Sequence, residues 1–353
     1  MNTTRKFLLA GIILLLGSSL FGLELKQGRM KVVLHENTGR FSAYYLTDVR
    51  RNRYTPFLLD DDPRTSVMSL LVGNKVYRMG ESFDFSQSVQ KTADGAAFIW
   101  KSGFLEIHQE FTFISSAESS LSDGFIITVT IRNIAESPVS VGMRYLFDTY
   151  IGEDDEVHFS TPSRASVREE LDYTGSLPDY WVSTGSRTEP IALQVMLRGP
   201  GITKPDRLIL ANWKRLNDSS WNYDSSGSRN FNLLPYSIND SAACIYYNPV
   251  QIPSGGERVI TMVLGQYSAA GFALTERTDE EISELYTKTV SSDTSAADPM
   301  EIARTDLLTI KDLLDRIDGL IVSGSKVPQD QIDAIAQIVQ NLEERKKQHE
   351  EQR

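Results

Sequence analysis

The chain is poor in the residues on which many enzymes depend. Its 353 residues include one cysteine, Cys244, and four histidines. A single cysteine excludes an internal disulfide, and four histidines leave little nitrogen for a zinc site. The sequence also has no GxSxG, Walker A, GxGxxG or HExxH motif. The catalytic residues, if there are any, are therefore unknown from the sequence, and a hydrolytic or epimerising enzyme is possible without being indicated.

Basic residues are in the minority, with 36 lysines and arginines against 47 aspartates and glutamates. The resulting net charge of -11 argues against nucleic acid and anionic membranes as partners, because both carry negative charge themselves. A negative chain remains compatible with cation binding and with neutral glycans.

Long apolar runs are also rare, and the clearest covers residues 7–16. Arg5 and Lys6 precede it, and Gly17 and Ser18 follow it, which is the pattern of a secretory signal peptide over residues 1–22. The run is shorter than the ~20 residues that a membrane span needs. We expect a periplasmic or secreted protein whose mature chain does not insert into a membrane.

Residues 23–267 mostly alternate between polar and apolar side chains, and turn residues interrupt them at short intervals. The stretch SLLVGNKVYRMG predicts a hairpin, because two apolar runs flank the glycine-led turn Gly73–Asn74. Residues 199–240, rich in Asn, Ser, Gly and Asp, are predicted as long loops at one end of the domain. Many short strands without alternating helices predict a mainly β fold, a large antiparallel β-sandwich of the supersandwich type.

The period of the apolar residues becomes helical after residue 267. We expect a helix and a linker over residues 268–297 and a C-terminal helical hairpin over residues 298–353, with Gly324 between its two helices. The apolar stripe of the hairpin has two interpretations. It packs within the chain, or it docks onto a partner or a second copy.

An acidic loop follows a strand-like run at residues 148–159. Asp148, Glu153, Asp154 and Asp155 supply oxygen ligands of the kind that calcium prefers, although their spacing does not match the EF-hand pattern. If the chain binds a metal we expect calcium at these four residues, and we expect no other cofactor. The alternative is a solvated or hydrogen-bonded turn, in which an Arg144–Asp148 contact only stabilises the fold.

Three aromatic residues in the loop-rich part are candidate ligand-binding residues, namely Trp181, Trp221 and Tyr223. Flat rings on exposed loops stack on sugar rings, and polar neighbours such as Asn222 can contact hydroxyl groups. The alternative is that these rings fill the open end of the sandwich.

The phrase SVGMRYLFDTYIGEDDEVHFSTP resembles a segment of uncharacterised exported bacterial β-sandwich proteins. More broadly, residues 25–267 resemble the galactose-mutarotase-like supersandwich of carbohydrate-active proteins, through NIAESPVSV and PVQIPSGGERVITMVLG. The catalytic histidine and glutamate of mutarotases match no motif of this sequence. The resemblance therefore implies a fold and not a reaction.

These observations lead to two functional predictions. The first is an exported structural or binding protein of the envelope or of an appendage, with no indicated catalysis. Its partner would be another envelope or appendage protein, or a second copy bound through the C-terminal helices. The alternative is a carbohydrate-binding or carbohydrate-active protein of the mutarotase-like fold, with a glycan as ligand.

Overall fold

The computed structural model describes most of residues 22–353. It does not describe 60, 154–156, 186–190, 273, 275–280, 282, 283, 286–298, 323, 325, 328, 352 and 353. The predicted signal peptide lies outside the described residues apart from residue 22, as does most of the predicted helix and linker. No helix of the described part is long and apolar enough to cross a membrane.

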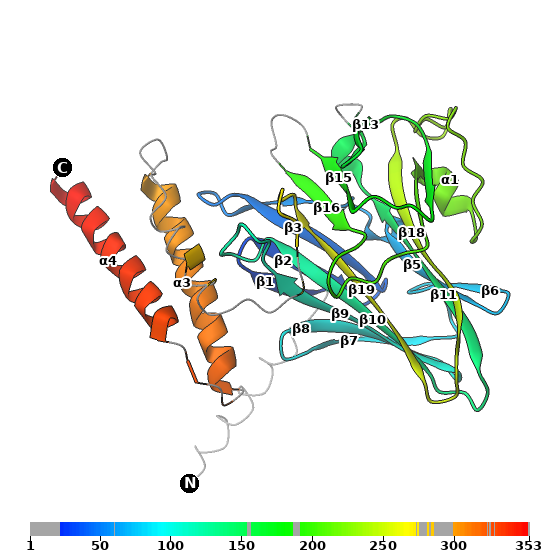
Figure 1. Ribbon diagram of the computed structural model, residues 1–353, viewed down its shortest axis with the longest axis horizontal. Helices are drawn as coiled ribbons and strands as arrows, with labels where there is room; N and C mark the ends of the chain where they lie inside the picture. Colours follow the sequence, from blue (N-terminus) through cyan, green and yellow to red (C-terminus); the bar gives the residue numbers. More distant parts are fainter. Residues whose placement is uncertain are drawn as a thin grey trace, which may run out of the picture.

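Three antiparallel sheets make up the body of the protein (Figure 1). The first has the order β1 (Leu23–Gln27), β2 (Met30–His35), β3 (Arg40–Asp48), β4 (Arg53–Pro56). The second has the order β13 (Arg164–Val167), β12 (Phe159–Thr161), β15 (Tyr180–Thr184), β16 (Ala192–Met196), β19 (Glu257–Gln266), β10 (Gly124–Asn133), β9 (Leu105–Ile114), β8 (Gly95–Lys101), β7 (Ser86–Lys91). The third has the order β14 (Leu171–Thr174), β17 (Arg207–Asn212), β18 (Ser241–Ile252), β11 (Val139–Asp148), β5 (Val67–Val72), β6 (Lys75–Arg78). The predicted mainly β fold is thus confirmed.

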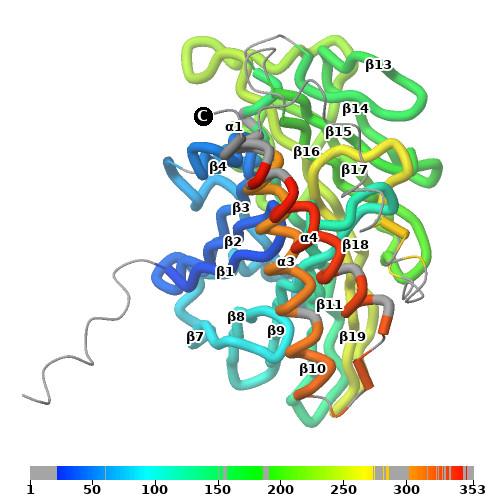
Figure 2. The backbone as a smooth tube through the Cα atoms, turned by 90° about the vertical axis from the view of Figure 1, so that its left-hand side faces the viewer, coloured from blue at the N-terminus to red at the C-terminus, as the bar shows by residue number. Residues whose placement is uncertain are grey.

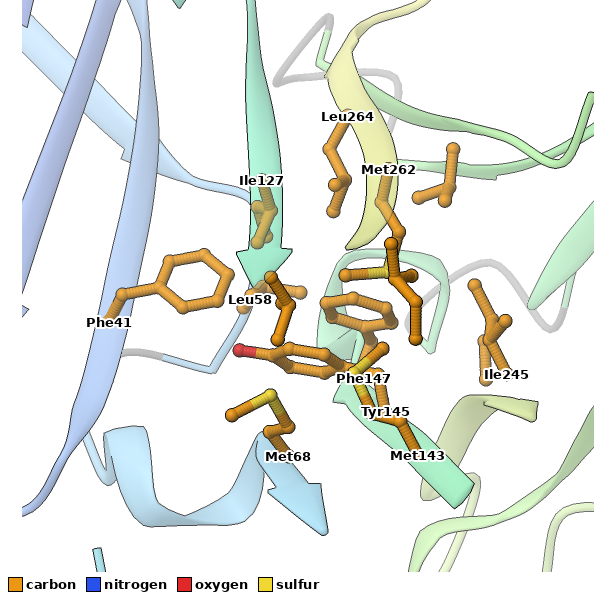
Figure 3. Packing of buried hydrophobic residues seen from close by; sticks show 14 of the residues in the cluster. Phe41, Leu58, Met68, Ile127, Met143, Tyr145, Phe147, Ile245, Met262 and Leu264 are labelled. Carbon is orange, nitrogen blue, oxygen red and sulfur yellow. The ribbon is translucent and has the colours of Figure 1, made fainter. Parts of the chain in front are cut away.

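One core joins the three sheets because alternate side chains of each strand point to the same face. Along β9, Leu105, Ile107, Gln109 and Phe111 are buried, and the residues that alternate with them are partly exposed. Figure 3 shows side chains of different sheets meeting in this core, among them Phe41, Ile127 and Tyr145. The Tyr145 hydroxyl accepts a hydrogen bond from the Gln109 amide at 2.8 Å, so these two buried polar groups satisfy one another.

The predicted hairpin at Gly73–Asn74 is confirmed, since Val72 of β5 pairs with Lys75 of β6. Gly73 has a φ of 58°, a conformation that favours glycine in such turns. The interpretation of residues 199–240 as loops misses one helix, α1 (Trp213–Asp218). Asn212 is the N-cap of this helix, and its side chain accepts a hydrogen bond from the Arg215 N–H.

Two helices form the predicted C-terminal hairpin, α3 (Pro299–Val322) and α4 (Gln329–Glu351). They lie side by side at one side of the sheets (Figures 1 and 2). Leu313 of α3 and Ile338 of α4 are fully buried where the helices meet. The Arg304 side chain of α3 donates a hydrogen bond to the Val49 carbonyl just after β3, at 3.1 Å.

The two short 3-10 helices, η1 (Pro63–Thr65) and η2 (Tyr150–Gly152), lie in connections close to the end of β11. The Ser66 hydroxyl, just after η1, accepts a hydrogen bond from the Asp148 N–H at 3.0 Å. The Leu59 N–H donates to the Asp148 carbonyl at 3.1 Å. The backbone of Asp148 is therefore fixed from both sides.

Candidate functional site

Three carboxyl groups meet at the end of the central strand pair β11–β18. Asp148 ends β11, and Asp240 directly precedes β18. Because β11 pairs with β18 so that Asp148 lies opposite Ala242, the two aspartates reach the same edge of the sheet. Figure 1 shows the two strands side by side. The topology thus brings together two acids that are far apart in the sequence.

Glu153 completes this group, which we call the carboxylate cluster (Asp148, Glu153 and Asp240). The turn of η2 brings Glu153 back to β18, where its Oε1 accepts a hydrogen bond from the Ser241 N–H at 2.9 Å. One oxygen from each of the three carboxyl groups lies within 4.8 Å of the other two. Glu153 and Asp240 are half-buried, so the cluster is open to solvent on their side.

Asp148 is the buried member of the cluster, with 3% of its surface exposed. Burial raises the pKa of Asp148 to about 7 because the charged form loses its hydration. The neighbouring carboxylates of Asp240 and Asp62 act in the same direction, while a hydrogen bond with Thr65 opposes them. Burial also raises the pKa of Asp240, and a hydrogen bond with Ser237 opposes that shift. The carboxyl group of Asp148 therefore titrates near neutral pH.

The cluster overlaps only in part with the predicted calcium site. The structure brings Asp148 and Glu153 together, while Asp154 and Asp155 lie outside the described residues. Asp240 was missed because it lies far away in the sequence, directly before β18, and only the pairing of β11 with β18 places it here. Calcium takes six to eight oxygens, so three carboxylates fit such an ion if water or backbone oxygens supply the rest. Calcium binding stays a prediction.

For the structural alternative we predicted a contact between Arg144 and Asp148. This prediction is wrong, because the Arg144 side chain binds elsewhere in the described part of the chain. Arg144 is buried and donates hydrogen bonds to the Leu216 carbonyl at 3.2 Å and the Ser219 hydroxyl at 3.0 Å. Leu216 lies in α1 and Ser219 is the residue that ends it. A positive charge at a helix C-terminus is stabilised by the orphan carbonyls, so Arg144 holds α1 against the sheet.

Residues 231–240 form a rigid loop that leads into the cluster; we call it the 231–240 loop. The Asn212 amide nitrogen lies within hydrogen-bond distance of three acceptors, the Phe231 carbonyl at 2.7 Å, the Ser237 hydroxyl at 2.9 Å and the Asp240 carbonyl at 2.9 Å, which share its two N–H groups. Backbone hydrogen bonds join Leu233 and Ser237 in both directions. One buried side chain thus fixes both ends of the loop and its middle.

Three large apolar side chains stand out from the tip of this loop. Leu234, Tyr236 and Ile238 are 71%, 76% and 69% exposed. The hydrogen bonds within the loop fix the backbone from which these side chains project. Apolar side chains grouped on a rigid surface loop are typical of a binding surface.

The predicted ligand-binding rings lie mostly inside the protein. Trp181 is fully buried and packs edge-on against Phe159, with ring centroids 5.6 Å apart. Tyr223 is 8% exposed. Trp221 is partly buried and packs edge-on against Tyr246. This placement favours the alternative that the rings fill the end of the sandwich. Contact between these three rings and a ligand stays a prediction.

The Tyr223 hydroxyl belongs to a buried ionic network around Glu170. It donates to Glu170 Oε1 at 2.7 Å, and Arg215 and Arg229 form ion pairs with the same carboxylate at 2.8 Å and 2.9 Å. The Ser226 N–H donates to the other oxygen at 3.1 Å. Both oxygens of Glu170 accept hydrogen bonds from α1 and the loop that follows it, so this network holds the helix and the loop together.

Known proteins give limited help with the site. No protein-family model matches the chain, and no curated protein matches it. The chain is similar to the solved structure of a galactose mutarotase related enzyme from Lactobacillus acidophilus, with 11% identity, 72% of this chain and 100% of that chain covered, and a TM-score of 0.42. It is also similar to a galactose mutarotase-like protein from Lactobacillus casei ATCC 334, with 9% identity, 70% and 100% covered, and a TM-score of 0.43.

A third similar structure is an alpha-N-acetylgalactosaminidase from Bifidobacterium bifidum, seen with GalNAc. Its identity is 11%, its TM-score is 0.39, and the match covers 82% of this chain and 42% of that one. The weak resemblance to galactose-mutarotase-like proteins that the sequence predicted is confirmed at this level. It assigns neither a family nor a reaction, so the function must be argued from the residues of the chain itself.

Proposed function

We propose that the chain is an exported carbohydrate-binding protein whose site combines the 231–240 loop with the carboxylate cluster. The observation that carries this proposal is the exposed ring of Tyr236 on a rigid loop that leads directly into Asp240. A sugar ring has apolar C–H faces and a rim of hydroxyl groups. An aromatic face beside carboxylate acceptors is the combination that binds both.

The three members of the cluster differ in burial, and this difference supports ligand binding at the solvent-facing side of the cluster. Glu153 and Asp240 are half-buried and can accept hydrogen bonds from sugar hydroxyls, while Asp148 lies behind them with 3% exposure. Asp148 and Asp240 form no ion pair within the described chain. Their oxygens are thus not neutralised by lysine or arginine, and hydroxyl donors from a ligand would stabilise them.

Binding at this site requires no catalytic residue. Of the two functions that the sequence suggests, we therefore choose the alternative, a carbohydrate-binding or carbohydrate-active protein, and within it carbohydrate binding. An exported chain with a preformed site meets soluble or wall-bound glycans outside the cytoplasm. The preformed loop favours binding, since a rigid site loses little conformational entropy when the ligand arrives.

The test is isothermal titration calorimetry of the purified chain against soluble oligosaccharides of neutral hexoses, amino sugars and uronic acids. We expect one class to bind with 1:1 stoichiometry and Tyr236→Ala to weaken its binding roughly tenfold or more, as removal of an aromatic anchor does. Phe83→Ala is the matched control, because Phe83 is a fully exposed ring on the turn after β6. Absence of binding at millimolar sugar, or equal affinities of the two variants, would overturn the proposal.

A further inference from the structure

The C-terminal hairpin carries a group of large apolar side chains that the rest of the chain leaves exposed. On α3 these are Leu307, Leu314, Ile321 and Val322, exposed by 57%, 47%, 59% and 89%; on α4 they are Ile332 and Val339, exposed by 45% and 41%. We call these six residues the hairpin stripe. Scattered apolar residues are normal on a surface, but a row along two adjacent helices is not.

The spacing of the hairpin stripe is that of a helix–helix interface. Leu307, Leu314 and Ile321 follow one another at intervals of seven residues, as do Ile332 and Val339. Intervals of seven return a helical side chain to nearly the same face, and such repeats are typical of helices that pack against another helix. Ile310 and Ile317 lie at the intermediate positions of the α3 repeat, so α3 has a full heptad pattern.

The contact between α3 and α4 does not account for the hairpin stripe. That contact uses other residues, with Leu313 and Ile338 fully buried and Ile310, Ile335 and Leu342 packed around them. If the heptads are counted from Leu307 in α3 and from Ile332 in α4, Leu313 and Ile338 occupy the same heptad position. The stripe residues Leu314 and Val339 each follow that position by one residue. Two antiparallel helices that face each other through equivalent positions present their stripes on the same side. The hairpin therefore offers one apolar surface.

The charges beside the α3 part of the stripe indicate what covers it. Lys311 and Asp318 are both exposed, are seven residues apart and occupy equivalent flanking positions of the heptad. If two α3 helices pack antiparallel about a two-fold axis between Leu314 and Asp315, Lys311 of each copy lies opposite Asp318 of the other. The same alignment brings Leu307 of each copy opposite Val322 of the other, and Leu314 opposite Asp315, which forms an ion pair with Lys311 of its own helix at 3.1 Å. At positions 311 and 318 the surface is therefore complementary to itself in charge.

We propose that the chain forms a two-fold dimer in which the α3–α4 hairpins of two copies pack together through the hairpin stripe. The four helices then form a bundle with a common apolar core. The occupant of the stripe is a second copy of the same chain. This inference is independent of carbohydrate binding, because it uses none of the residues of that site.

The first experiment measures the mass of the full purified chain by sedimentation velocity across concentrations from 0.1 to ~100 µM, the range in which modest protein interfaces form. We expect a dimer, and Leu314→Glu should weaken it roughly a hundredfold, because it places two charges in the apolar core. Gln337→Glu adds the same charge on an exposed position of α4 away from the stripe and is the control. Circular dichroism at 222 nm verifies that both variants keep their helices.

The second experiment tests the antiparallel pairing itself. Lys311→Asp and Asp318→Lys should each weaken self-association roughly tenfold, since each brings two like-charged pairs together. A 1:1 mixture of the two variants should form a heterodimer with near wild-type affinity, because every pair across the two-fold axis is then opposite in charge. A monomeric wild-type chain at ~100 µM, or association that Leu314→Glu leaves unchanged, would overturn the proposal. Failure of the mixture to recover would overturn the antiparallel arrangement.

Discussion

The buried carboxyl group of Asp148 should make the stability of the protein depend on pH in a defined direction. Burial raises its pKa from 3.8 to about 7 in the folded chain. Between these two values the folded state holds a proton that the unfolded state has released. Asp148 therefore contributes stability that is fully present below about pH 4 and is lost as the pH rises through about 7.

The size of the effect follows from the separation between the two pKa values. At about 1.4 kcal/mol for each pH unit, the interval from 3.8 to about 7 corresponds to about 4 kcal/mol. Asp148→Asn has nearly the same shape and cannot ionise. We expect the free energy of unfolding of this variant, relative to the wild type, to rise by about 2 to 4 kcal/mol from pH 4 to pH 8.

The assay is urea denaturation followed by tryptophan fluorescence at intervals of one pH unit, with the wild type and the variant measured together. Asp62→Asn is a suitable control, because a hydrogen bond with Arg64 lowers the pKa of Asp62. Asp62 is then ionised in both the folded and the unfolded chain above about pH 4, so the difference between Asp62→Asn and the wild type should stay nearly constant from pH 4 to pH 8. A constant difference between Asp148→Asn and the wild type from pH 4 to pH 8 would refute this account of the cluster.

Two further predictions concern Glu170 and calcium binding by the carboxylate cluster. Glu170→Gln should lower the free energy of unfolding by about 3 kcal/mol, because it leaves two arginines beside a buried neutral group. Glu169 is its exposed neighbour, and Glu169→Gln should change the free energy of unfolding little in the same denaturation assay. If calcium binds the carboxylate cluster, calcium should raise the melting temperature at pH 8 and a chelator should lower it, and Glu153→Gln should abolish both effects. An unchanged melting temperature of the wild type would contradict the calcium prediction.

The sequence predicts the sandwich and the hairpin well because their signals are periodic and local. The alternation of apolar residues along β9 and the glycine-led turn at Gly73 each depend on a few consecutive residues. The short helix α1 escapes the same reasoning, since six residues are too few for a helical period to appear. Its signal was Asn212, which begins the helix and also fixes the 231–240 loop.

The candidate site was only half predictable for a different reason. Asp148 and Glu153 are close in the sequence, so an acidic loop is visible there without a structure. Asp240 joins them through the pairing of β11 with β18, and no local pattern reports which strand pairs with which. Composition likewise suggested that Tyr223 faces a ligand, although its hydroxyl is used by the buried Glu170.

A comparison of the two buried carboxyl groups explains why the cluster, and not the Glu170 network, is the better candidate for function. Glu170 is surrounded by two guanidinium groups, a hydroxyl and an N–H, so its charge is compensated and its contribution is to stability. Asp148 has acidic neighbours and no ion pair within the described residues, and burial leaves it with a pKa of about 7. At neutral pH this arrangement opposes folding rather than supporting it. Asp148 and Asp240 form no ion pair in the described part of the chain, so they are better candidates than Glu170 for contact with a ligand that supplies hydrogen-bond donors.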